Sequence, residues 1–185
     1  MSTWTLDPAH SQIEFAVKHM MITTVRGQFR KFTVDVDFDE AQPERSTVVA
    51  HIEASSIDTG MEARDAHLKS ADFFETEKYP ELTFRSNRIQ SDGDGYKILG
   101  DLTIRGETRP VTLEAEIGGV VPNMQGGRRA AFDATTKISR KAFGLSWNVA
   151  LESGGFLVGD EIKISIDLAV LQADAAPSEV AATAS

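Results

Sequence analysis

The sequence predicts an all-β domain of eight antiparallel strands, arranged either as a sandwich or as an up-and-down barrel. Segments in which apolar and polar residues alternate recur along almost the whole chain, and an alternation with a period of two is typical of a strand with one buried face. Turn residues separate these segments, and only one stretch has the features of a helix. Many strands joined in sequence by turns favour these two architectures.

The first two strands lie within the first forty residues. In residues 13–17, Ile13, Phe15 and Val17 share one face. Residues 25–38 also alternate, but their apolar residues change phase at about residue 30. Because a regular strand cannot move its apolar face to the other side, we expect a β-bulge near Arg30 or Lys31 that restores the phase and bends the strand.

Six further strands are predicted in residues 46–54, 81–89, 96–104, 109–119, 130–138 and 161–171. Turn sequences such as Ser91-Asp92-Gly93-Asp94-Gly95 and Arg105-Gly106-Glu107 separate them. Several inward positions hold small residues, among them Gly100 and Ala134. Two interpretations stay open, because an eight-stranded barrel either fills its lumen with side chains or holds one small ligand.

One long connection between strands is predicted to contain one or two short helices. Residues 61–70 have the features of a helix, with Thr59 as the cap and Glu62 returning the hydrogen bond in a capping box. Residues 71–80 form a second short turn or helix that ends before Pro80. Residues 172–185 are small and polar, so we expect a single domain over residues 1–171 and a disordered tail.

The composition excludes several classes of protein. The chain of 185 residues has no cysteine, which rules out disulfides and thiolate zinc sites, and its formal charge of −9 argues against nucleic-acid binding. No apolar run approaches the roughly 20 residues of a membrane span, so we expect no stable membrane insertion. The N-terminus lacks the features of a signal peptide, which favours a cytoplasmic protein, or a periplasmic one if a leader has been removed.

Histidines offer the only starting point for a catalytic or metal site. His10, His19, His51 and His67 show no spacing typical of metal ligands, and we expect no metal. Asp65 with His67 or His19 could act as a base and its orienting carboxylate, which gives an alternative function: a hydrolase or isomerase acting on a lipophilic substrate. No serine motif supplies a nucleophile. A charged cluster that ties the helix to the barrel rim explains these residues better, and we expect no catalytic residues.

Large apolar residues in the connections are more informative, because loops are normally polar. The sequence His19-Met20-Met21-Ile22 is apolar where a turn is expected, and methionine adapts to irregular apolar partners. Such residues either cap one end of a core or line the entrance to a cavity. The set comprises Met20, Met21, Ile22, Met61, Leu68, Phe73, Phe74, Phe143, Leu145, Trp147 and Phe156.

Over residues 4–171 the chain resembles the YceI-like family of polyisoprenoid-binding proteins. The matching stretches include Asp7-Pro8-Ala9-His10-Ser11, Val25-Arg26-Gly27-Gln28-Phe29, Ser56-Ile57-Asp58-Thr59-Gly60, Arg64-Asp65-Ala66-His67-Leu68, Gly100-Asp101-Leu102-Thr103-Ile104-Arg105-Gly106, Phe143-Gly144-Leu145 and Val158-Gly159-Asp160. Each motif is weak alone, and their shared order carries the resemblance. The chain departs from the family in two respects: it lacks the secretory leader of many members, and Ser139 precedes Arg140 where the family pattern has Asn.

The resemblance implies an extended, lipocalin-like, eight-stranded antiparallel barrel with a long apolar tunnel. It implies non-catalytic binding, storage or transport of an isoprenoid lipid, either a polyprenyl compound or a prenylated quinone precursor, without a cofactor, and it allows for a homodimer. The mouth of the tunnel would draw on His19, Arg64, Asp65, His67 and Arg140. The residues expected to contact the lipid are Ile13, Phe15, Val17, His19, Met20, Met21, Phe29, Phe73, Phe74, Phe84, Ile98, Leu102, Ile104, Phe132, Ala134, Ile138, Phe143, Trp147 and Ile164.

Overall fold

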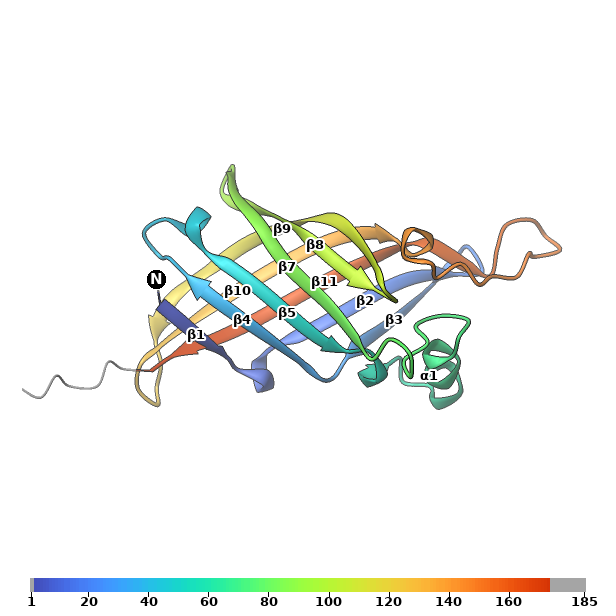
Figure 1. Cartoon of the computed structure of the whole chain (residues 1–185), viewed down its shortest axis with the longest axis horizontal. Helices are drawn as coiled ribbons and strands as arrows, with labels where there is room; N and C mark the ends of the chain where they lie inside the picture. The colour runs from blue at the N-terminus through green and yellow to red at the C-terminus, as the bar shows by residue number, and fades with distance from the viewer. Residues whose placement is uncertain (1, 174–185) are drawn as a thin grey trace, which may run out of the picture.

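A ladder of antiparallel strands closes on itself in the computed structural model, which describes residues 2–173 (Figure 1). The strands run obliquely to the long axis of the molecule, and α1 lies at one end. The elements are β1 (Ser2–Leu6), η1 (Pro8–His10), β2 (Gln12–His19), β3 (Thr23–Phe29), β4 (Phe32–Phe38), η2 (Pro43–Arg45), β5 (Thr47–Glu53), η3 (Ala54–Ser56), β6 (Ile57–Asp58), α1 (Glu62–Lys69), β7 (Glu81–Asp92), β8 (Gly95–Ile104), β9 (Glu107–Pro122), β10 (Arg128–Ser139), η4 (Arg140–Phe143) and β11 (Val158–Gln172).

The barrel closes through β1, which pairs with β4 on one side and with β11 on the other. Trp4 lies opposite Val36, and Leu6 lies opposite Val170. After η1 the chain continues as β2, which also pairs with β11, so that β1 and β2 share one position in the wall. The next position is shared by β3, which pairs with β2, and β4, which follows β3 in the chain. Counting β1 with β2, β3 with β4 and β5 with β6 gives eight wall positions, which confirms the predicted antiparallel barrel.

The β1 strand is the element that the sequence pattern did not predict. It has five residues, of which Trp4 is 1% exposed and Leu6 is partly buried against the same core. Two inward residues are too short a signal for a period-two pattern. The side chain of Trp4 packs edge-on against Phe38, at a ring-centroid distance of 6.1 Å.

The predicted irregularity at Arg30 and Lys31 is a break between two strands. The β3 strand ends at Phe29 and β4 begins at Phe32, so apolar residues face the lumen on both sides of the break. The backbone there is held by the neighbouring segment, because the Arg30 N–H donates to the carbonyl of Ser56 and the Glu53 N–H donates to the carbonyl of Lys31. The wall therefore changes direction without losing backbone hydrogen bonds.

The N-terminal turn of α1 differs from the predicted capping box. The N-cap is Met61, which makes no side-chain cap, and Glu62 does not return a bond to Thr59. Asp65 takes that role, since its Oδ1 accepts hydrogen bonds from the Thr59 N–H at 2.9 Å and from Thr59 Oγ1 at 2.6 Å. Residues 71–80 form successive turns and no second helix. The predicted tail, residues 172–185, lies outside the described residues except for its first two.

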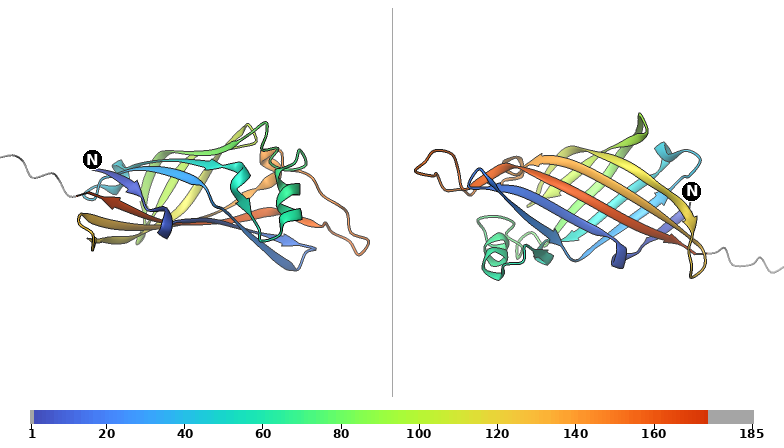
Figure 2. Two further views of the ribbon diagram at one scale, coloured as in Figure 1. Left: turned by 90° about the horizontal axis from the view of Figure 1, so that it is seen from below. Right: turned by 180° about the vertical axis from the view of Figure 1, so that it is seen from behind.

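The two ends of the barrel differ in what covers them (Figure 2). At one end, called here the helix end, lie α1, the β2–β3 turn and the long β10–β11 connection. The β4–β5, β7–β8 and β9–β10 turns lie at the opposite end, near the N-terminus. Among the described residues, no helix is long and apolar enough to cross a membrane.

Gly27 is required where the ring of Phe15 lies against the backbone of β3. A Cβ atom at residue 27 would meet Phe15 Cζ at 2.3 Å and Thr59 Cγ2 at 2.9 Å. We expect Gly27→Ala to lower the free energy of unfolding by roughly 1–3 kcal/mol through overpacking, measured by chemical denaturation. Gly118→Ala is the matched control, because its nearest neighbour would lie at 3.4 Å. Equal effects of both substitutions would contradict this explanation.

Candidate ligand-binding cavity

Inward side chains from all eight wall positions surround an elongated apolar cavity of about 240 Å³. Along β8 the lining includes Tyr96, Ile98, Leu102 and Ile104, a span of about 26 Å at the roughly 3.3 Å rise per strand residue. A cavity of this volume spread over this length is narrow. It is nevertheless far larger than the roughly 10–15 Å³ needed for one water molecule, so the lumen is hollow and not packed shut.

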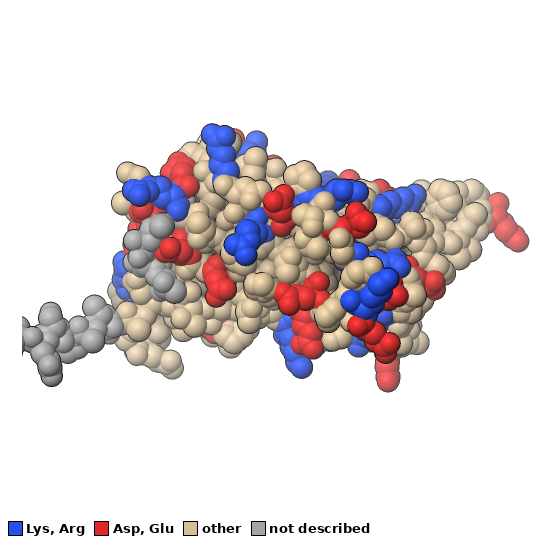
Figure 3. All heavy atoms as spheres, viewed as in Figure 1, with Lys and Arg blue, Asp and Glu red and all other residues tan. Residues whose placement is uncertain are grey.

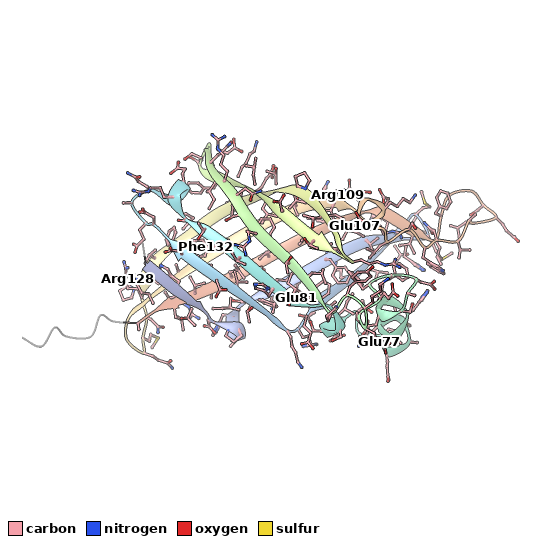
Figure 4. The ribbon with its side chains drawn as sticks, in the orientation of Figure 1. Glu77, Glu81, Glu107, Arg109, Arg128 and Phe132 are labelled. Carbon is pink, nitrogen blue, oxygen red and sulfur yellow. The ribbon has the colours of Figure 1, made fainter. Side chains whose placement is uncertain are left out.

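Most of the residues predicted to contact a ligand line this cavity. They are Ile13, Phe15, Val17, Phe29, Phe73, Phe74, Phe84, Ile98, Leu102, Ile104, Phe132, Ala134, Ile138, Phe143 and Ile164. Figure 4 labels Phe132, which packs edge-on against Phe38 across the lumen at a centroid distance of 5.1 Å. Four predicted residues, His19, Met20, Met21 and Trp147, lie outside the lining. No ligand is present, so direct contact of any of these residues with one stays a prediction.

The cavity also has lining residues that the site prediction omitted. Most occupy the apolar phase of a predicted strand, so the same period-two signal already identified them. These are Val34, Val36, Phe38, Val48, Ala50, Ile52, Leu82, Val111, Leu113, Ala115, Ile117, Ile162, Ile166 and Leu168. Ile89 is out of phase with Leu82 and reaches the lumen through the register shift between Ser86 and Arg88. Others, such as Pro43 and Val158, lie outside the predicted strands, and only their position in the folded barrel brings them to the lumen.

Two small residues expected to border hollow space differ in their surroundings. Ala134 lines the cavity. Gly100 does not, because a Cβ atom there would meet the Phe84 ring at 2.5 Å and the Arg85 carbonyl oxygen at 2.5 Å. The expectation for Gly100 is therefore wrong: the Phe84 side chain from the neighbouring strand already fills that space.

The helix end of the cavity is closed by apolar side chains from two connections. Leu68, Phe73 and Phe74 come from α1 and the turns after it, while Phe143 and Leu145 come from η4 and the residues that follow. Phe73, Phe143 and Leu145 are buried. These residues confirm that the apolar connections cap one end of the core, one of the two roles considered for them.

An aromatic cluster joins the two halves of this cap. The His67 ring lies edge-on to Phe73 at 5.1 Å and to Trp147 at 4.7 Å between ring centroids. Phe73 and Trp147 are themselves 5.4 Å apart. Trp147 therefore supports the cap from outside the cavity.

Arg140 is a buried cation at the helix end of the cavity, 4% exposed and part of the lining. Its guanidinium donates to the backbone carbonyls of Leu145 (2.6 Å), Gly159 (2.8 Å), Trp147 (2.9 Å) and Val158 (3.2 Å). It thereby ties the β10–β11 connection to the start of β11. Burial lowers the pKa of the Arg140 guanidinium, which still remains protonated because arginine does not lose its charge in proteins.

Asp160 lies beside Arg140 and is held by the neighbouring chain. Burial raises the pKa of this carboxyl, but hydrogen bonds from Ser139 Oγ at 2.7 Å and the Lys141 N–H at 3.1 Å more than offset this and leave the pKa below its ordinary value. Ser139 therefore donates a side-chain hydrogen bond to Asp160. The stabilisation that Asp160 contributes is complete above its unfolded-state pKa and is lost as the pH falls through its lower folded-state pKa.

The other residues considered for the mouth are engaged locally. Arg64 donates to Thr59 Oγ1 and to the Thr59 carbonyl, and Asp65 accepts from Thr59, so both stabilise the entry into α1. His67 pairs with Asp72 at 2.8 Å. The predicted pairing of Asp65 with a histidine is therefore not formed. Within residues 2–173 no group of three or more His, Asp or Glu side chains could hold a metal ion.

Comparisons with known proteins identify the fold and the family. The model of a family described as the YceI-like domain matches residues 4–170. The UPF0312 protein SA2479 of Staphylococcus aureus (strain N315) is 40% identical over 164 residues, which cover 88% of this chain and 94% of that protein. The crystal structure of Burkholderia cenocepacia BcnA matches with a TM-score of 0.77 at 29% identity, covering 89% of this chain and 98% of that one.

A more distant solved structure shares the fold alone. It is described as a polyisoprenoid binding domain from Saccharophagus degradans implicated in plant cell wall breakdown. The TM-score is 0.62 at 14% identity, and the match covers 93% of this chain and 99% of that one.

Arg140 gives the first test of how the cap is held. Arg140→Met removes the donors to four carbonyls, and unsatisfied buried polar groups each cost about 1–3 kcal/mol. We therefore expect a loss of at least about 3 kcal/mol in the free energy of unfolding, measured by urea denaturation. Lys137→Met in the preceding strand β10, an exposed position, should change it by less than about 0.5 kcal/mol. A small effect of Arg140→Met would show that the connection is held by other contacts.

Proposed function

The chain belongs to the YceI-like family, and we propose on that basis that it is a non-catalytic carrier of one long isoprenoid lipid. The observation that carries the proposal is the narrow apolar cavity enclosed along the length of the barrel. Its shape favours a single extended chain over a compact ligand. The lipid is a polyprenyl compound or a prenylated quinone precursor, and no cofactor takes part.

Burial of hydrocarbon supplies the affinity in this proposal. Each methylene transferred from water contributes about 0.8 kcal/mol, so a long prenyl chain nominally exceeds the practical limit of roughly 18–21 kcal/mol. Ordering of the chain offsets part of this gain, and the lipid starts in a membrane, where it is already shielded from water. The length of the cavity therefore selects the length of the chain.

A branched, unsaturated chain suits the lining better than a straight acyl chain. Flat aromatic rings from Phe15, Phe84 and Phe132 lie between branched side chains and small ones such as Ala134. This uneven wall matches the regularly spaced methyl branches of an isoprenoid. The Saccharophagus degradans domain, described as polyisoprenoid binding, has the same fold, which supports this class of ligand.

A hydrolase or isomerase is less well supported. Asp65 is bound to Thr59 and His67 to Asp72. The pair that such an enzyme would use, Asp65 with His67 or with His19, is therefore not formed. A homodimer remains a part of the proposal that rests on the resemblance alone.

Mass spectrometry of an organic-solvent extract of the purified protein tests the proposal directly. We expect an isoprenoid in a ratio approaching one per chain, together with a rise in melting temperature when a polyprenol is returned to the extracted protein. An extract without isoprenoid, from a protein that polyprenols do not stabilise, would contradict it.

A substitution at Ala134 tests whether the ligand occupies the cavity. Ala134→Phe places a ring in the lumen, so we expect it to reduce bound lipid severalfold while lowering the stability of the lipid-free protein by less than about 1 kcal/mol, because the ring fills open space. The control is Thr135→Phe, which adds the same ring to the exposed face of β10. Lipid content and melting temperature are measured for both variants, and equal lipid content would place the ligand elsewhere.

A further inference from the structure

Two turns at the helix end pack together and project beyond the barrel (Figures 1 and 2). One is the β2–β3 turn at Met20 and Met21, and the other is the small hairpin of residues 149–157 within the β10–β11 connection. The Met20 N–H donates to the Leu157 carbonyl at 2.7 Å. The Met21 side chain lies beside Gly155, where a Cβ atom would meet Met21 Sδ at 3.0 Å. The two turns therefore form one unit.

This unit exposes an unusual set of apolar side chains, called here the apolar tip. The exposed fractions are 51% for Met20, 59% for Met21, 82% for Ile22, 46% for Val149 and 51% for Phe156. Single exposed apolar residues are common on soluble proteins, but a contiguous group indicates an interaction site. Figure 3 shows this projecting end as mostly uncharged atoms, with an acidic side chain at its extremity.

The backbone of the β2–β3 turn adds an independent observation. Met20 has φ of 52° and Met21 has φ of 70°, and the Ile22 N–H donates to the His19 carbonyl. A β-turn with positive φ at both central residues strongly favours Asn and Gly, and a side chain with a Cβ is disfavoured there. The two methionines therefore lower the stability of this turn, and they also expose apolar surface.

We propose that the apolar tip docks reversibly on the surface of a lipid bilayer, with Met20, Met21, Ile22 and Phe156 inserted among the headgroups. The proposal rests on the proposed function for its purpose, because a water-insoluble lipid must pass between the cavity and a membrane. The tip also lies next to residues that line the cavity. Val17 and Val158 line the cavity. Val17 lies three residues before Met20, and Val158 lies two residues after Phe156.

The size and shape of the tip favour a bilayer over a second copy of the chain. The tip offers five exposed apolar side chains, whereas each partner in a standard interface contributes roughly 20–30 residues. The tip is also a convex projection and not a flat face (Figure 1). A short apolar projection suits insertion to the depth of the headgroups.

The charges around the tip suit a zwitterionic bilayer. Lys141 Nζ lies 5.6 Å from the centre of the Phe156 ring, and Lys18 precedes the β2–β3 turn. Glu152 is the only charged residue between Lys141 and Asp160. Cations can approach the lipid phosphates while Glu152 approaches the choline ammonium. The chain as a whole carries a formal charge of −9, which opposes binding to an anionic surface.

Co-sedimentation of the full chain with phosphatidylcholine vesicles tests the proposal. The main variant is Met20→Asn with Met21→Gly, which removes both apolar side chains and supplies the residues this turn prefers. We expect its vesicle partition coefficient to fall about tenfold or more, with a melting temperature equal to or above that of the original protein. Phe156→Ser should also weaken binding. Met124→Asn is the control, because Met124 is fully exposed in the β9–β10 turn at the opposite end.

Several outcomes would overturn the proposal. These are no co-sedimentation of the original protein, equal losses for the double variant and Met124→Asn, or stronger binding to anionic than to phosphatidylcholine vesicles. A dimer that dissociates in the double variant, seen by analytical ultracentrifugation, would assign the tip to a second copy instead. Extracted lipid is measured separately on the same samples. Lipid without vesicle binding removes only the docking proposal, whereas vesicle binding without lipid removes the proposed function.

Discussion

Closure of the barrel through β1 is the constraint on which the rest of the structure depends. Once β1 pairs with both β4 and β11, the ladder of strands closes into a ring, and the apolar side chains have one interior to enter. The buried core residues and the cavity lining are accordingly largely the same set. The fold therefore has no separate core that could stay intact if the lumen were filled differently. A molecule held in the lumen becomes part of the core, and its binding is coupled to stability.

The two ends of the barrel are closed in different ways. At the helix end, Arg140 holds the β10–β11 connection by its backbone carbonyls, and the His67–Phe73–Trp147 cluster joins that connection to the segment after α1. A cap held by one buried cation and a few ring contacts closes the cavity without a continuous sheet over it. At the other end, Trp4 and Phe38 are buried and close the wall where β1 begins. Polar side chains such as Arg140 thus hold the connections in place, and the lining of the cavity itself is apolar.

Much of the wall could be predicted from the sequence, because the period of two in a strand fixes which side chains face inward. Residues such as Phe15, Phe132 and Ile164 were assigned to the lumen on that pattern, and they line it. The pattern gave wrong predictions where contacts between segments determine the position of a side chain. Phe84 fills the space beside Gly100, Asp65 replaces Glu62 in holding Thr59, and Met20 and Trp147 lie beyond the lining because their loops extend past the last strand residues. The spacing of residues along the sequence predicts none of these contacts.

A crystal structure of the protein purified without lipid extraction would test the central claim most directly. The account predicts continuous, tubular electron density through the lumen, passing Ile98, Ala134 and Phe132 and ending near the cap formed by Phe73 and Phe143. That density would correspond to one extended chain. A lumen in which these side chains turn inward and meet each other, with no density between them, would contradict the account, because the barrel would then be a packed core with no space for a ligand.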